Sequence, residues 1–287
     1  MEYRRRRRRR RSRSRNRGGD SASGAGALLL AVLLFAGVVY FVSASSTGNW
    51  LVQNVVAPIF GSKASPTPTT ENGGTDKTGS VAVKDLEYYA VQLGVFSSEG
   101  NAKSLGQEVM AKGAAGYTFF DGTKYRVFAC AFPNEASALS VKENLKSSGY
   151  ECLVFPIKLK ASTIDVTAPE DQITKMNEII LAMRSCVDKI GEISLTFDKD
   201  KQTVEQGKAA VTAAFNDIAS IGNIVSFHAV PEAQLVGGAY DVFVTAMKKL
   251  SEQNYSDTVA FSANIKYTQL QLIYQYMVLS GELSSAG

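Results

Sequence analysis

The sequence holds few of the side chains from which metal and disulfide sites are built. One histidine, His228, occurs in 287 residues, and there are three cysteines, Cys130, Cys152 and Cys186. Most zinc hydrolase sites need two or more histidines beside a carboxylate, so this count excludes them. No two cysteines form a CxxC pair, and an odd number argues against a disulfide framework. We therefore expect neither a metal nor a cofactor, and we interpret His228 as a loop residue.

Arginine is scarce along most of the chain and concentrated at its start. Residues 4–17 contain eleven arginines, whereas only Arg126 and Arg184 lie elsewhere. Residues 1–24 carry a net charge of +9, and because the whole chain carries +4, the remainder carries −5. A mildly negative body argues against nucleic acid as a partner. We interpret residues 1–24 as a cytoplasmic tail that fixes membrane topology.

Charge is absent from residues 25–44, AGALLLAVLLFAGVVYFVSA. About 20 apolar residues are enough to cross the hydrocarbon core of a membrane. Because arginine-rich flanks stay in the cytoplasm, we predict a single-pass transmembrane helix in the cell membrane, with the C-terminal domains extracytoplasmic. The alternative is a signal peptide cleaved after residues 42–44, Val-Ser-Ala. Both alternatives put the rest of the chain outside the cytoplasm.

Apolar residues are nearly missing from residues 61–80, GSKASPTPTTENGGTDKTGS. Such a segment cannot bury a core and is typical of a flexible linker. We therefore interpret residues 45–85 as a juxtamembrane segment followed by a Ser/Thr/Pro/Gly linker.

Residues 86–160 combine strand and helix patterns. The expected elements are strands over 87–96, 117–122, 123–132 and 150–159, with helices over 98–112 and about 133–147. The order β-α-β-β-α-β predicts an α+β, ferredoxin-like domain, in which two helices cover one face of an antiparallel sheet. The first strand then separates the third from the fourth, so we expect Cys130 and Cys152 to be small apolar residues and not a disulfide.

The first and third strands carry two short motifs, YAVQLGVF over 89–96 and YRVFACAF over 125–132. They resemble the SPOR domain, whose strands read roughly Tyr-x-Val-Gln-x-Gly-Ser-Phe and Tyr-Arg-Val-x-x-Gly-Pro-Phe. Val95, Lys124 and Cys130 depart from that pattern. The SPOR domain is an extracytoplasmic module that binds peptidoglycan at division and sporulation sites. The resemblance therefore implies the glycan strands of peptidoglycan as a partner.

Alternation of side chains predicts which residues meet the ligand. Tyr88, Ala90 and Gln92 should lie on the open face of the sheet, and neighbouring-strand pairing should add four residues there: Lys124, Arg126, Phe128 and Cys130. Glutamine and arginine supply hydrogen-bonding groups for hydroxyls, N-acetyl carbonyls and lactyl carboxylates, and aromatic rings can stack on sugars. We predict five glycan-binding residues: Gln92, Arg126, Tyr88, Lys124 and Phe128. The alternative is an ordinary solvated face with Arg126 in a surface ion pair.

Residues 165–287 change to helical periodicity. Apolar positions at alternating spacings of three and four predict helices from Pro169, over 198–221, 231–250 and 256–283. Four amphipathic helices with short loops predict an all-α four-helix bundle. We interpret Tyr267, Tyr274 and Tyr276 as core and rim packing. Nothing in this region indicates its role beyond docking an unknown protein partner or self-association.

Together these patterns predict a membrane-anchored peptidoglycan-binding protein at septal or sporulation wall, and not an enzyme. Two alternatives stay open. An extracytoplasmic adaptor would use the ferredoxin-like domain to bind protein, since fold alone does not fix function. A peptidoglycan hydrolase of the transglycosylase type needs only an acidic residue, which counting residues does not exclude.

Overall fold

The computed structural model of the chain describes residues 76–223 and 230–286. These residues belong to one compact unit, residues 71–287. The predicted tail, the transmembrane helix over 25–44, most of the linker and His228 lie outside the described residues. Among the helices that are described, none is both long and apolar enough to cross a membrane.

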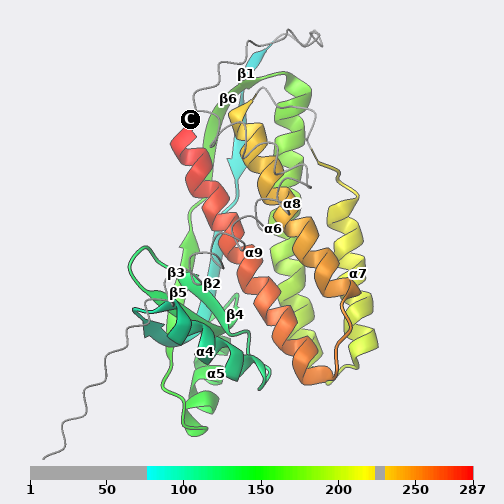
Figure 1. Cartoon of the computed structure of the whole chain (residues 1–287). Coiled ribbons are helices and arrows are strands. Elements are labelled where there is room, and N and C mark those ends of the chain that lie inside the picture. The colour runs from blue at the N-terminus through cyan, green and yellow to red at the C-terminus, as the bar shows by residue number, and fades with distance from the viewer. Residues whose placement is uncertain (1–75, 224–229, 287) are drawn as a thin grey trace, which may run out of the picture. The chain divides into compact units, whose positions relative to one another are not determined.

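The ferredoxin-like order predicted for residues 86–160 is present (Figure 1). Its elements are β2 (Leu86–Phe96), α4 (Glu99–Met110), β3 (Tyr117–Phe120), β4 (Tyr125–Phe132), α5 (Glu135–Ser147) and β5 (Leu153–Leu159). The strands pair antiparallel in the order β3-β4-β2-β5, so β2 separates β4 from β5 as predicted. On one face, α4 and α5 pack over a core cluster that includes Val91, Cys130 and Ala138.

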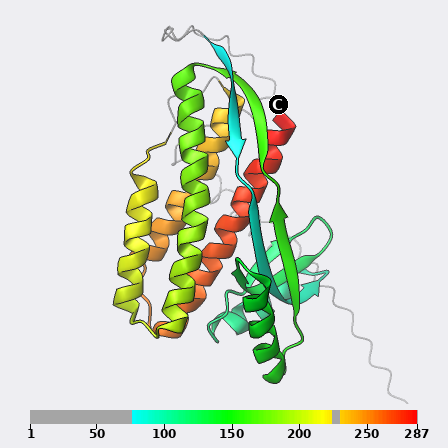
Figure 2. The same ribbon diagram turned by 180° about the vertical axis from the view of Figure 1, so that it is seen from behind.

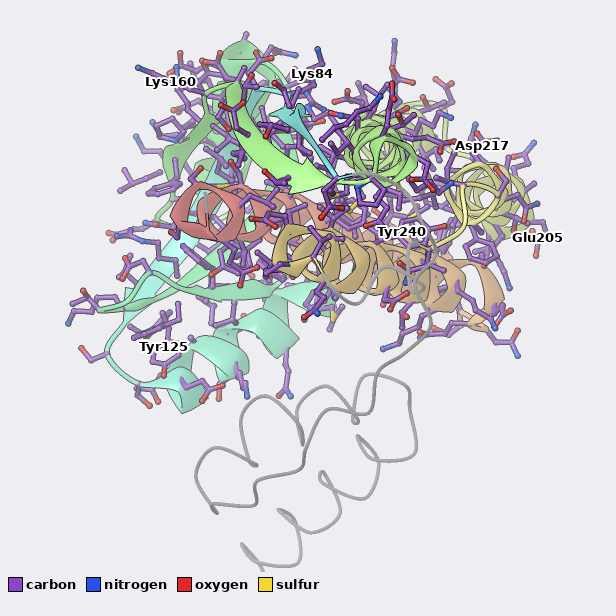
Figure 3. The ribbon with its side chains drawn as sticks, turned by 90° about the horizontal axis from the view of Figure 1, so that it is seen from above. Lys84, Tyr125, Lys160, Glu205, Asp217 and Tyr240 are labelled. Atoms are coloured by element: carbon purple, nitrogen blue, oxygen red, sulfur yellow. The ribbon has the colours of Figure 1, made fainter. Side chains whose placement is uncertain are left out.

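Two further strands replace part of the predicted linker. β1 (Lys77–Val83) pairs antiparallel with β6 (Ser162–Ala168) as a two-stranded ribbon. The linker prediction over residues 61–80 is therefore wrong for its last residues, and β6 occupies the boundary expected between the two domains. Lys84 and Asp85 join β1 to β2, while Lys160 and Ala161 join β5 to β6. Each strand of the ribbon therefore continues after two residues into a strand of the sheet (Figures 2 and 3).

The four predicted helices are α6 (Glu170–Lys199), α7 (Val204–Ala219), α8 (Pro231–Glu252) and α9 (Thr258–Ala286). α6 begins after Pro169 with Glu170 and Asp171 in its first turn, where negative charge favours a helix. The apolar residues of α6 that follow the alternating spacing of three and four are all buried: Ile173, Met176, Ile180, Met183, Val187 and Ile190. α7 begins at a capping box made by Thr203 and Gln206.

The bundle packs directly on the sheet, so the two predicted domains share a core. One cluster of buried residues contains Leu86 and Phe128 of the sheet, Val81 of the ribbon, and residues of all four bundle helices. α9 lies between the sheet and the other helices, and packs against α6 and α8 on one side and against β3 and β4 on the other (Figure 1). From above, Glu205 and Asp217 on α7 mark the side of the bundle far from Tyr125 of the sheet (Figure 3).

Candidate functional site

The sheet face predicted to be open is partly covered by the bundle. Tyr88 and Phe128 retain only 2% and 3% of their exposure, because they pack in the core shared with the helices. The prediction that these two side chains face solvent is therefore wrong. The cause lies outside the domain: α9 carries buried apolar residues on more than one side, among them Ala263, Leu270 and Ile273, and a helix that is apolar around its circumference is buried on all sides.

Polar contacts reinforce the docking of the bundle on the sheet. The hydroxyl of Tyr88 donates to Asp188 Oδ1 of α6 at 2.9 Å. The Tyr276 hydroxyl of α9 accepts from the Lys84 backbone nitrogen at 3.0 Å, and Gln269 Nε2 donates to the Ala131 carbonyl at 3.2 Å. Burial, and then the charge of Asp188, raises the pKa of Tyr88. The phenol therefore stays protonated and continues to donate this bond at physiological pH.

Gln92 and Arg126 meet, as the sequence predicted for neighbouring strands. Arg126 Nη1 donates to Gln92 Oε1 at 2.9 Å. Gln92 was expected to be exposed, but it is 6% exposed. A buried amide oxygen needs a hydrogen-bond donor, and Arg126 supplies it. This contact explains a glutamine in the middle of an otherwise apolar strand.

The guanidinium of Arg126 is held by two further groups. Its Nε and Nη2 atoms lie 2.7 and 2.6 Å from Asp121 Oδ2, and its central carbon lies 5.1 Å from the centroid of the Phe155 ring. An arginine over an aromatic face gains a cation–π contribution. The side chain of Arg126 nevertheless remains 25% exposed, so the guanidinium is fixed in position and still reaches solvent.

Asp121 connects the β3–β4 turn to this guanidinium. Its Oδ1 atom accepts hydrogen bonds from the backbone nitrogens of Thr123 at 2.9 Å and Lys124 at 2.8 Å. These backbone groups, and then Arg126, lower the pKa of Asp121. The turn that begins at Asp121-Gly122, a residue pair typical of hairpin turns, thus positions the arginine as well.

Replacing Asp121 with asparagine should separate these two roles. Asparagine keeps an acceptor for the turn but loses the charge that faces Arg126. Because the pKa of Asp121 is lowered from 3.8, its stabilising contribution is present above that ordinary value and is lost as the pH falls through the lowered pKa. Melting temperatures of wild type and Asp121→Asn should differ at neutral pH and converge at low pH. A difference independent of pH would contradict the ion pair.

The sheet around Arg126 forms a small mixed region, here called the Arg126 rim: the buried Gln92 together with Val95, Asp121, Arg126 and Leu153. Val95 pairs across the strands with Arg126 and Leu153 with Gln92, and both are exposed, by 44% and 63%. Exposed apolar side chains beside a fixed arginine suit a ligand that has both polar groups and apolar surfaces.

Two other predicted residues have different positions. Lys124 lies next to the turn, is exposed, and donates from Nζ to Ser97 Oγ at 2.7 Å. Cys130 was expected on the open face with Phe128, but it is buried against α5 with Val91 and Ala138. The reason is a β-bulge: Gln92 pairs with Phe128 and Val91 with Cys130, which leaves Ala129 as an extra residue. One extra residue reverses the alternation beyond it.

A cavity of about 280 Å³ lies between the sheet and α9, beside the Arg126 rim. Its walls include four aromatic residues of the sheet and two residues of α9: Tyr117, Phe119, Phe128, Phe155, Tyr274 and Met277. The ring centroids of Phe119 and Tyr274 are 4.5 Å apart. Sequence reasoning assigned Tyr274 only to packing. The sequence did contain a signal for this position of α9. The helix has a second apolar face, which indicates that it packs against something other than the bundle helices.

The described residues contain no group of three or more His, Cys, Asp or Glu side chains that could hold a metal ion. Cys130, Cys152 and Cys186 are free thiols. Burial raises the pKa of Cys130 and that of Cys186 to about 12, so neither forms a reactive thiolate readily.

Comparison with known families identifies the sheet region. Residues 85–156 match the family model of the SPOR domain, close to the range of 86–160 expected from the two strand motifs. Neither the curated proteins nor the solved structures include a match to the chain. The match ends before β6 and the bundle, so it identifies neither. Residues 85–156 of this chain are a SPOR domain.

Proposed function

We propose that the chain is a membrane-anchored protein that binds the glycan strands of peptidoglycan and so gathers at septal or sporulation wall. The observation that carries this proposal is the Arg126–Gln92 pair, which lies in the SPOR domain and whose arginine remains 25% exposed. Arg126 is held in place by Asp121 and Phe155. A preorganised group loses less conformational entropy when it binds a ligand.

The rim offers groups that suit a peptidoglycan glycan. Arginine has five N–H donors and can bind a carboxylate or a carbonyl, which matches lactyl and acetamido groups. Val95 and Leu153 provide apolar contact for the sugar faces. Lys124, at the end of the β3–β4 turn, adds a positive charge. Tyr88 is assigned to the packing of the bundle instead, and Phe128 is 3% exposed, so neither residue presents an open ring face at the rim.

The experiment is co-sedimentation of the full-length chain with cell wall that an amidase has stripped of its stem peptides. We expect the chain to pellet with the stripped wall more than with intact wall, because stripping exposes the glycan. A chain that stays in the supernatant with both would favour the protein adaptor. Clearing of wall in a zymogram would favour the hydrolase.

Membrane anchoring rests on the sequence of residues 1–44. A reporter enzyme that works only outside the cytoplasm should be active when it is fused after Gly287, and one that works only in the cytoplasm should be inactive there. Neutral replacements of the eleven tail arginines should scramble this orientation, because positive flanks hold the tail in the cytoplasm. A C-terminal reporter that is active only in the cytoplasm would contradict the topology.

A further inference from the structure

The cavity between the sheet and α9 is a partly open pocket and not a sealed void. A ligand can therefore reach it from solvent. At about 280 Å³, the cavity has the volume of about nine liquid waters at roughly 30 Å³ each. This volume is near the lower end of ligand pockets, so it fits a single ring or a small group and not an extended chain.

The walls are mainly aromatic and aliphatic, with Lys158 as a charged member. Tyr117, Phe119, Phe128 and Phe155 of the sheet face Tyr274 and Met277 of α9. Rings contact one another around it: Phe128 and Phe155 are 5.6 Å apart and Phe119 and Tyr274 are 4.5 Å apart between centroids. Aromatic walls favour a methyl group or the apolar face of a ring.

Phe155 links the cavity to the Arg126 rim. One face of this ring lies under the guanidinium of Arg126, with 5.1 Å between the centroid and the guanidinium carbon, and the residue also lines the cavity. Phe128, another wall, pairs across the strands with Gln92. A ligand beside Phe155 would meet the hydrogen-bond donors of Arg126 and the aromatic walls of the cavity.

Given the proposed function, on which this step rests, we infer that the cavity is a subsite for one N-acetylated sugar of the glycan strand. The acetamido methyl and one face of the pyranose would occupy the aromatic cavity, while carboxylate or hydroxyl groups of the strand bind Arg126. α9, which lies outside residues 85–156, supplies one wall through Tyr274 and Met277. The helical region is then part of the ligand site and not only a support for it.

The test measures binding of the full-length chain to peptide-free glycan strands, before and after chemical N-deacetylation. Two variants alter the α9 wall in opposite ways: Tyr274→Ala removes a ring, and Met277→Trp fills the cavity. The control is Phe120→Ala, which removes an exposed aromatic residue adjacent in sequence to Phe119 and packed instead on Tyr125. Thermal melting of each variant reports whether the fold is retained.

We expect each α9 variant, and deacetylation of the strands, to weaken binding about tenfold, with Phe120→Ala unchanged. If wild type binds and both α9 variants bind equally well, the subsite is overturned while the proposed function stands. If the variants weaken binding but deacetylated strands bind as tightly as acetylated ones, the assignment to the acetamido group is overturned. If wild type does not bind glycan at all, the proposed function itself fails, and the subsite with it.

Discussion

Replacing Arg126 with alanine should weaken binding of the full-length chain to peptide-free glycan strands by about ten- to a hundredfold. A hydrogen bond to a charged group contributes about 1.5–3 kcal/mol, and about 1.4 kcal/mol corresponds to a factor of ten. In the structure Nε and Nη2 face Asp121 and Nη1 faces Gln92. Each Nη atom carries two N–H groups, so each has one left for a ligand.

Two further variants distinguish geometry from charge. Arg126→Lys should recover only part of the binding, because lysine lacks the planar fork. Lys103→Ala, on α4 and paired with Glu99, removes one positive charge on the other side of the sheet and should leave binding unchanged. Equal weakening by Arg126→Ala and Lys103→Ala would indicate unspecific attraction to an anionic polymer and would contradict a defined site.

Replacing Tyr88 with alanine should destabilise residues 71–287 by about 3–5 kcal/mol, the cost of truncating a buried aromatic side chain. The ring is 2% exposed in the core shared by sheet and bundle, and its hydroxyl donates to Asp188. Tyr88→Phe should cost less, because it removes only this hydrogen bond. Urea unfolding at constant protein concentration measures all three proteins.

The neighbouring Tyr89 provides the matched control. It lies on the opposite face, is partly buried, and its hydroxyl donates to the exposed Glu87. Tyr89→Ala should therefore cost clearly less than Tyr88→Ala. If Tyr88→Ala stays within about 0.5 kcal/mol of wild type, as surface substitutions usually do, the helices do not cover this face, and Tyr88 returns to the candidate glycan-binding residues.

These two expectations describe a SPOR domain whose sheet face is divided. One part, around Tyr88 and Phe128, is used inside the molecule to hold α6 and α9. The other part, around Arg126, remains accessible. If only this part of the sheet binds sugar, binding would depend strongly on Arg126. The aromatic cavity beside Arg126 would then have a defined position relative to the ligand.

The helices and strands of the SPOR domain and the bundle could be predicted from the sequence. The spacing of apolar residues, two in strands and three or four in helices, predicted the β-α-β-β-α-β order and the four helices. This works because a strand or helix buries one face, and the residues on that face lie only a few positions apart in the sequence. The motifs around Gln92 and Arg126 identified the domain, and strand order alone brought these two residues together. β6 also shows apolar residues at every second position: Ile164, Val166 and Ala168. Because this segment lies directly before the start of a predicted helix, it was not assigned to a strand.

How these elements combine depends on contacts between distant parts of the chain. β1 is a strand because it pairs with β6, whose residues lie 79 to 91 positions later, and because it packs on α6. A polar segment carries no local sign of such a partner. The bulge at Ala129 placed Cys130 on the helix side, which strict alternation does not predict. The sheet face is covered because α9 has a second apolar face, which is buried in one core with Tyr88 and Phe128. These residues lie far apart in the sequence, so local spacing does not reveal the contact.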